Sequence, residues 1–127
     1  MKRIPAFIFL VALALATAAS QAAPKLPAKI TYPELVSLLA NPASRVLLLD
    51  VRTAEEYRSG HIKGAVLMPY DELEASFSEK DKGRPIVVYC RSGRRSAIAK
   101  ATLEKMGYRD VSDFGGIDSW KGRLITE

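Results

Sequence analysis

The sequence predicts an α/β domain with a mainly parallel central sheet flanked by helices. Two continuous apolar runs, Val46–Leu49 and Ile86–Tyr89, have the length expected of strands that are buried on both faces. Segments of helical or polar character alternate with these runs, and such alternation is typical of parallel strands joined by helical crossovers. About 105 residues remain after the N-terminal segment, which is enough for one domain and not comfortably for two.

The N-terminal 22 residues have the pattern of a secretory signal peptide. Lys2 and Arg3 provide a positive start, Ile4–Ala19 is apolar and uncharged, and small residues precede an expected cleavage after Ala22. The apolar run is shorter than the roughly 20 residues that a membrane-spanning helix requires. We therefore expect a cleaved leader without a stable membrane anchor, and a periplasmic protein if the host is Gram-negative.

The charge balance argues against nucleic acid as a partner. Cleavage after Ala22 removes Lys2 and Arg3 and leaves 17 basic against 14 acidic residues, so the formal net charge falls from +5 to +3. Apart from one cluster of arginines the basic residues are scattered, and no basic stretch is interleaved with aromatic residues. The sequence carries no signal for an oligomeric state.

The domain, expected at residues 31–127, begins with a helix. Residues 23–30 are expected to form an extended leader into it. Thr31 is positioned as an N-cap, and apolar residues then recur at helical spacing until Asn41-Pro42 ends the helix. A buried strand, a short polar helix, a brief strand and a modest helix are expected next: Arg45–Asp50, Thr53–Ser59, Ala65–Met68 and Asp71–Phe77.

The second half of the domain continues the alternation of strands and helices. After the strand Ile86–Tyr89, a polar segment leads into a helix that runs to Met106, where Gly107 supplies a C-terminal stop. The last expected elements are a strand, a glycine pair and a short helix: Asp110–Phe114, Gly115-Gly116 and Ile117–Trp120.

Cys90, the only cysteine, directly follows the second apolar strand. A single cysteine cannot form an internal disulfide. In an exported chain it is therefore either a reactive thiol or a small buried apolar side chain, unless it bridges to another molecule. Composition alone leaves these interpretations open.

The position of Cys90 favours the reactive interpretation. Ligands of open parallel sheets bind beyond the carboxyl ends of the strands, and Cys90 occupies such an end. The helix that follows presents unpaired N–H groups, and Gly93 permits a turn in which successive N–H groups converge on an anion. Helix N-termini and nearby cations lower a thiol pKa from about 8.5 to roughly 3.5–7.5.

The side chains around the thiol fit the same interpretation. Arg91, Arg94 and Arg95 bring positive charge, and Ser92 and Ser96 bring hydroxyl groups that can donate to an anion. Basic residues at the start of a helix oppose the helix dipole, so this cluster is mildly destabilising unless an anion is present. The segment therefore predicts an anion site around the cysteine.

Other site chemistries have little support. His61 is the only histidine and lies far upstream of the cysteine. A metal site would need carboxylates at ligand spacing, and a serine triad would need the glycines of a nucleophile elbow; the sequence offers neither. We expect no metal and no cofactor.

The residues around Cys90 and two further blocks resemble the rhodanese family of sulfurtransferases. The run Cys90–Arg95 is similar to the six-residue active loop of that family, cysteine-x-x-glycine-x-arginine. The other two blocks resemble its upstream and C-terminal signatures: Asp50-Val51-Arg52 with Glu56-Tyr57, Gly60-His61-Ile62 and Gly64-Ala65, and then Gly115-Gly116 with Trp120. The resemblance covers nearly all of the chain after the leader.

The resemblance implies a thiosulfate sulfurtransferase that works through a persulfide on Cys90. The thiolate attacks the outer sulfur of a donor such as thiosulfate, sulfite leaves, and an acceptor such as cyanide or a thiol removes the sulfur. Because the chain has no second cysteine, the acceptor must be external. The residues implied in binding the donor are those of the loop, with the last as its closing arginine: Arg91, Ser92, Gly93, Arg94 and Arg95.

Four upstream residues are expected to support the loop without acting on the substrate. Arg52 is expected to form an ion pair with Glu56 or Asp50 beneath the loop. His61 is expected to be hydrogen-bonded within its turn.

Two other functions remain open at this point. A non-catalytic rhodanese module would carry sulfur or bind a partner, although inactive members commonly lose the cysteine that this chain keeps. A cysteine phosphatase or arsenate reductase would use the same strand, loop and helix. Its arginine would follow the cysteine by six places, however, and Ser96 occupies that position here.

Overall fold

The central sheet consists of four parallel strands in the order β3-β1-β4-β5. The computed structural model describes residues 2–3 and 25–126, so the apolar run and the cleavage site of the expected signal peptide lie outside the described residues. The two inner strands, β1 (Leu47–Asp50) and β4 (Ile86–Cys90), pair along the whole length of β1. The edge strands are β3 (Val66–Leu67) and β5 (Val111–Gly116). The predicted α/β fold with a mainly parallel sheet is confirmed.

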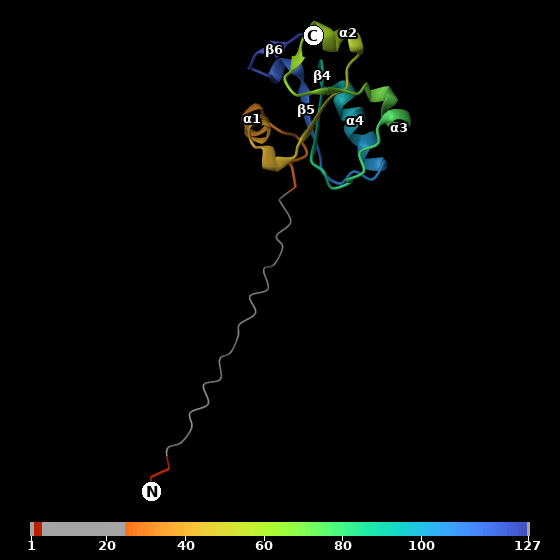
Figure 1. The fold of residues 1–127 in the computed structure, drawn as a ribbon. Coiled ribbons are helices and arrows are strands. Elements are labelled where there is room, and N and C mark those ends of the chain that lie inside the picture. The colour runs from red at the N-terminus through yellow and green to blue at the C-terminus, as the bar shows by residue number, and fades with distance from the viewer. Residues whose placement is uncertain (1, 4–24, 127) are drawn as a thin grey trace.

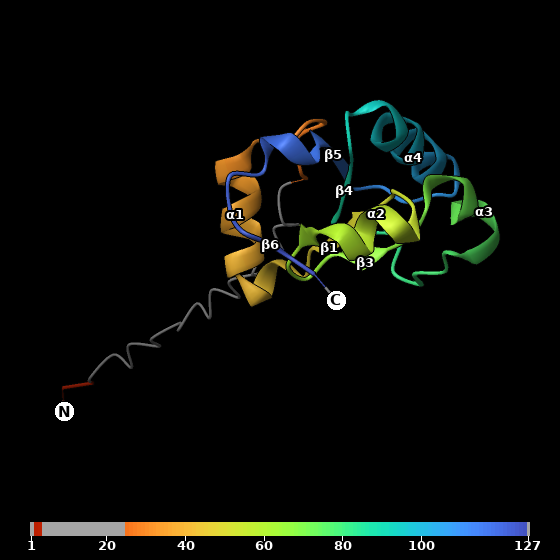
Figure 2. The ribbon, with the colours of Figure 1, turned by 90° about the horizontal axis from the view of Figure 1, so that it is seen from above.

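Helices cover both faces of this sheet (Figures 1 and 2). One face carries α1 (Tyr32–Ala40), and the other carries α3 (Leu73–Ser76) and α4 (Arg94–Lys105). The short helix α2 (Ala54–Ser59) lies at the end of the sheet where β1 and β4 finish. Within the described residues, three 3₁₀ turns accompany these helices: η1 (Pro42–Ser44), η2 (Tyr70–Glu72) and η3 (Ile117–Ser119).

Capping residues set where the first two helices begin. Thr31 precedes α1, and its hydroxyl accepts from the Glu34 N–H while the Glu34 carboxylate accepts from the Thr31 N–H. Thr53 and Glu56 form the same reciprocal pair at α2. Each pair satisfies two donors that a helix start would otherwise leave unpaired.

Alternate residues of β4 divide the core into two layers. Ile86, Val88 and Cys90 pack into a cluster on the side of α3 and α4. Val87 and Tyr89 pack into a second cluster on the side of α1. All five residues of β4 are buried. The continuous apolar run therefore reflects burial on both faces, as the sequence predicts.

The elements differ from those expected from sequence in several places. The helix expected at Asp71–Phe77 is divided into the turn η2 and the four-residue helix α3, and the short helix expected at Ile117–Trp120 is the 3₁₀ turn η3. β5 continues through Gly115 and Gly116, where the sequence predicts its end at Phe114, because these glycines pair with Tyr89 and Cys90 of β4. An antiparallel pair, β2 (His61–Ile62) with β6 (Leu124–Ile125), was not anticipated. Strands of two residues are too short to show alternation in sequence.

The segment before the domain is attached to the sheet. Lys29 forms a parallel bridge with Asp113 of β5, and Ile30 is buried in the core. The Leu26 N–H donates to the Asp110 carboxylate at 2.8 Å. Within residues 2–3 and 25–126, no helix combines the length and apolar character needed to cross a membrane.

Candidate active site

Cys90 is the last residue of β4, and its side chain is fully buried on the α4 side of the sheet. Arg91 and Ser92, which follow it, are exposed. Helix α4 begins two residues later at Arg94. The strand, the short loop and the helix therefore place the thiol beneath the N-terminus of α4, at the carboxyl end of the sheet where ligands of parallel sheets bind.

Gly93 shapes the loop around the sulfur. It is the N-cap of α4 and has φ 99° and ψ −13°, a left-handed conformation that favours glycine. In this conformation its N–H donates to Cys90 Sγ, with a nitrogen-to-sulfur distance of 3.0 Å. Loops of this kind aim successive N–H groups at one anion.

Ser96 connects the thiol to the loop from within the first turn of α4. Its side chain is buried, and Oγ lies 3.5 Å from Cys90 Sγ. The same hydroxyl donates to the Gly93 carbonyl oxygen at 3.1 Å. The sequence predicts that the Ser96 hydroxyl can bind an anion at the cysteine, and this hydroxyl does lie against the sulfur; the N-cap of the helix is Gly93.

Two opposing effects act on the ionisation of Cys90. Burial raises the pKa of the thiol, because a thiolate is poorly solvated there. Hydrogen bonds to the thiolate lower it: first that of the Ser96 hydroxyl, which turns from the Gly93 carbonyl to donate to the ionised sulfur, and then those of the nearby backbone N–H groups of Ser96, Gly93 and Ser92. The hydrogen bonds outweigh burial, so the thiol pKa lies below its ordinary value.

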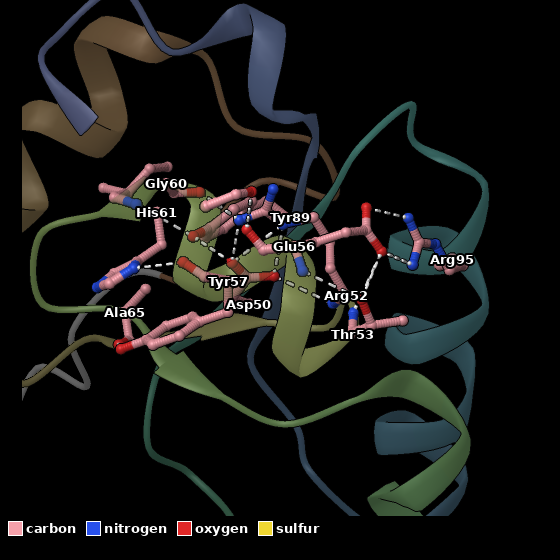
Figure 3. A network of polar contacts seen from close by, with 12 residues as sticks. Asp50, Arg52, Thr53, Glu56, Tyr57, Gly60, His61, Ala65, Tyr89 and Arg95 are labelled. Atoms are coloured by element: carbon pink, nitrogen blue, oxygen red, sulfur yellow. Dashed lines mark hydrogen bonds and ion pairs between the residues drawn. The ribbon is translucent and has the colours of Figure 1, made fainter. Parts of the chain in front are cut away.

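Arg95, the last residue of the loop motif, is already paired. Its guanidinium donates two hydrogen bonds to the Glu56 carboxylate, at 2.7 Å and 2.9 Å (Figure 3). Both side chains remain about one fifth exposed. This pair raises the pKa of Arg95 and lowers the pKa of Glu56 to about 2. The ion pair between Arg95 and Glu56 was not predicted from the sequence, which indicated Glu56 as a partner of Arg52.

Arg52 instead pairs with Asp50, the other partner that the sequence offered. Its guanidinium donates to both carboxylate oxygens, including Nη2 to Oδ2 at 2.7 Å, and also to the Gly60 carbonyl at 2.7 Å. The Tyr89 hydroxyl donates to the same carboxylate at 2.8 Å and accepts from the Ile62 N–H at 3.2 Å. Burial and the Asp50 charge raise the pKa of Tyr89, so it remains a neutral donor.

His61 lies at the far end of this network from Arg95 (Figure 3). Its Nδ1 is 2.8 Å from the Tyr57 carbonyl oxygen, and its ring stacks on the Tyr57 ring with centroids 3.6 Å apart. The ring is buried. A hydrogen bond and a ring stack therefore hold His61 in its turn, where the sequence predicts a hydrogen-bonded histidine.

Two hollows flank the loop. The first lies beside Arg95 and is lined by residues that follow β1 and β3: Val51, Arg52, Thr53, Pro69, Tyr70 and Asp71, with Arg95 itself. The second lies between the loop and β5: Lys29, Ile30, Ser92, Gly93, Asp113, Phe114, Gly115, Gly116 and Ser119. Arg91 and Arg94 extend into solvent around this end of the sheet. The charges of these two exposed arginines are available to attract an anion toward the loop.

No set of three or more His, Cys, Asp or Glu side chains is gathered in metal-binding fashion within the part of the chain that the structure describes. The residues near Cys90 offer hydrogen-bond donors and arginines instead. These groups suit an anion rather than a cation.

The main residue that sequence reasoning missed is Tyr89. It lies in an apolar run and was interpreted only as core, yet its hydroxyl is buried against Asp50. Aligning the two apolar strands would have shown it, because Asp50 and Tyr89 are partners in the β1–β4 register. A buried tyrosine hydroxyl usually has a hydrogen-bond partner.

Comparison with known proteins places most of the chain in one family. The model of the rhodanese-like domain matches residues 31–123. Thiosulfate sulfurtransferase PspE of Escherichia coli (strain K12) is 38% identical over 71 residues, which cover 54% of this chain and 68% of PspE. The YrkF protein of Bacillus subtilis (strain 168) is 39% identical over 77 residues, 60% of this chain but only 42% of YrkF.

A solved structure shows the same fold. The structure described as a rhodanese with anions from E. coli superposes with a TM-score of 0.60 and is 32% identical in sequence. The superposition covers 65% of this chain and 99% of that one.

Proposed function

We propose that this chain, which belongs to the family of rhodanese-like domains, moves sulfane sulfur from a small anionic donor to an external acceptor. The sulfur is carried as a persulfide on Cys90. A general sulfurtransferase role is supported by relatives such as the thiosulfate sulfurtransferase PspE. The observation that carries the proposal is the Gly93 N–H, which lies 3.0 Å from Cys90 Sγ in a loop that stabilises the thiolate.

The proposed first step forms the persulfide. The Cys90 thiolate attacks the outer sulfur of thiosulfate, a new S–S bond forms, and the old S–S bond breaks with its electron pair leaving on sulfite. The donor, the persulfide and sulfite are all anions. One set of backbone N–H donors therefore serves each of them in turn.

The proposed second step returns the enzyme to its thiolate form. A thiol or cyanide attacks the outer sulfur of the persulfide, and the electron pair of the breaking S–S bond returns to Cys90. Because Cys90 is the only cysteine, no second thiol of this chain can take the sulfur. The acceptor is therefore a separate molecule.

The loop side chains are proposed to recruit and hold the donor. Arg91 and Arg94 are exposed beside the buried sulfur and attract anions to this end of the sheet. Ser92 and Gly93 contribute backbone N–H groups to the cradle. Arg95 lines the first hollow, and its role in the proposal is to bind the anionic donor there while it remains paired with Glu56. The solved E. coli rhodanese with anions supports an anion site in a fold of this kind.

We also propose that the protein acts in the periplasm after cleavage behind Ala22. The charged start and apolar run of the first 22 residues support this location. The N-terminal sequence of the protein recovered from a periplasmic extract tests it; a chain that still begins at Met1 would contradict cleavage.

The test of the sulfur transfer is an intact-mass measurement with Cys90→Ser as the matched control. After incubation with thiosulfate, the wild-type protein should gain the mass of one sulfur atom and lose it again on treatment with cyanide, with thiocyanate appearing. The Cys90→Ser protein should show neither change while keeping its circular dichroism spectrum. A wild-type protein that gains no sulfur from thiosulfate or from other sulfane donors would refute the proposal.

A further inference from the structure

Gly116 lies directly against the loop that surrounds the thiol. It is the partner of Cys90 in the pairing of β4 with β5. A Cβ atom at position 116 would lie 2.7 Å from the Arg91 carbonyl oxygen, 3.3 Å from Ser92 Cα and 3.4 Å from the Arg91 carbonyl carbon. All three atoms belong to the backbone, so no side chain can rotate away to make room.

The need for glycine at this position comes from the contact and not from the conformation of the residue. Gly116 has φ −83° and ψ 144°, an extended conformation that any residue adopts. Its neighbour Gly115 is the opposite case. Gly115 has φ 83°, which favours glycine, but a Cβ there would meet no atom within 4 Å. The two adjacent glycines therefore separate the effect of contact from the effect of backbone strain.

The contact between Gly116 and the loop controls the direction of one donor. The Arg91–Ser92 peptide group is planar, so a contact with its carbonyl and with Ser92 Cα fixes where the next peptide group begins. The carbonyl oxygen rests on Gly116. The next peptide group, which starts at Ser92, carries the Gly93 N–H, whose nitrogen lies 3.0 Å from Cys90 Sγ.

We propose that Gly116 is a positioning residue for the nucleophile: because it has no side chain, the Arg91–Ser92 peptide settles against β5, and the peptide that follows it directs the Gly93 N–H toward Cys90 Sγ. A side chain at 116 would push the peptide away from the strand and rotate this donor off the sulfur. The inference rests on the proposed role of Cys90, and it assigns to β5 a part in tuning the thiol that lies on β4.

The groups that surround Cys90 limit what else can change its ionisation. Arg95 is the cation that interacts with the thiolate, and Glu56 compensates its charge. Tyr70 packs against the same side of the core from η2. The three atoms nearest to the Cβ position of residue 116 belong to the backbone of Arg91 and Ser92, so a substitution there acts first on the loop backbone.

The test measures the pKa of Cys90 by its rate of alkylation with iodoacetamide across a pH range, in the wild-type, Gly116→Ala and Gly115→Ala proteins. Gly116→Ala should raise the thiol pKa by about 0.5 to 1, the size expected for one lost hydrogen bond to the thiolate. Gly115→Ala should lower the melting temperature, because alanine is strained at that φ, but should leave the thiol pKa unchanged.

Two results would overturn the inference. One is a folded Gly116→Ala protein whose thiol titrates as in the wild type; the other is an equal rise of the pKa in Gly115→Ala, which would point to general strain in this segment. If Gly116→Ala does not fold, an NMR titration of the wild-type protein still tests which amide donates to the sulfur. The Gly93 amide proton should shift downfield in the NMR spectrum as Cys90 ionises, and no shift would refute the assignment. Alkylation reports the thiol pKa whether or not sulfur is transferred, so failure here is distinct from failure of the proposed activity.

Discussion

Arg95 and Glu56, 39 residues apart in sequence, form a two-pronged ion pair with nitrogen-to-oxygen distances of 2.7 Å and 2.9 Å. The pair ties the first turn of α4 to α2, and through Thr53 to the end of β1. An arginine that the loop motif predicts as a donor-binding residue therefore also joins two helices. Its charge is compensated before any substrate arrives.

The first prediction concerns the stability contributed by this pair. Glu56→Gln should lower the free energy of unfolding at neutral pH by about 1–2 kcal/mol, between the values for exposed and buried ion pairs, because both side chains are partly exposed. Urea denaturation at pH 7 measures the loss. Glu55→Gln, in the same first turn but without this partner, should change stability by less than about 0.5 kcal/mol. Equal losses in both variants would contradict the assignment.

The second prediction is the pH dependence of the same contribution. The folded-state pKa of Glu56 is lowered to about 2 from an ordinary 4.5, so folding favours the carboxylate. The stabilisation should be fully present above pH 4.5 and should disappear as the pH falls toward 2. Unfolding curves of wild type and Glu56→Gln should therefore converge across this window. A difference that persists undiminished at pH 2 would show that the pair is not its source.

The third prediction separates the two arginines of α4 in the transfer of sulfur from thiosulfate to cyanide. Arg94→Ala should raise KM for thiosulfate by about two- to fivefold with no loss of stability, because this side chain is exposed. Arg95→Ala should raise KM by about tenfold and should also lower the melting temperature, because it breaks the pair with Glu56. Unchanged kinetics in Arg95→Ala would reduce that residue to a structural role.

The fourth prediction concerns the buried Tyr89 hydroxyl. Tyr89→Phe removes the donor to Asp50 and the acceptor for the Ile62 N–H, so it should cost about 1–3 kcal/mol of unfolding free energy. The alkylation rate of Cys90 should not change, because the side chain of Tyr89 lies on the opposite side of the sheet from the thiol. Tyr32→Phe serves as the control. A neutral Tyr89→Phe would mean that water or another group satisfies Asp50.

The fifth prediction compares two buried serines. Within the described residues, Ser112 Oγ is the one buried side-chain oxygen or nitrogen without a hydrogen-bond partner. Ser112→Ala should leave stability unchanged or raise it by up to about 1 kcal/mol. Ser96→Ala removes the bond to Gly93 and the contact to the sulfur, so it should destabilise the protein and raise the pKa of Cys90. Thermal melts and alkylation of both variants test this contrast.

The sequence alone determined the order of the main elements. Two continuous apolar runs predict strands buried on both faces, and β1 and β4 occupy those runs. Thr31 predicts the start of the first helix, because a cap depends only on residues within one turn. The six residues from Cys90 to Arg95 likewise predict an anion-binding loop, since its donors come from consecutive backbone groups.

Only the tertiary structure decided which distant groups meet. Glu56 follows Arg52 by four residues, a spacing at which two side chains in a helix can form an ion pair. In the structure, however, Arg52 pairs with Asp50 at the end of β1, and Glu56 pairs with Arg95. The contact of Gly116 with the Arg91 carbonyl depends on the register of β5 against β4. Local patterns specify helices, strands and loops through interactions a few residues long. Ion pairs and close backbone contacts depend instead on how those elements pack. The sequence therefore cannot show that Gly115 is needed for its positive φ and that Gly116 is needed because a side chain there would meet the loop backbone.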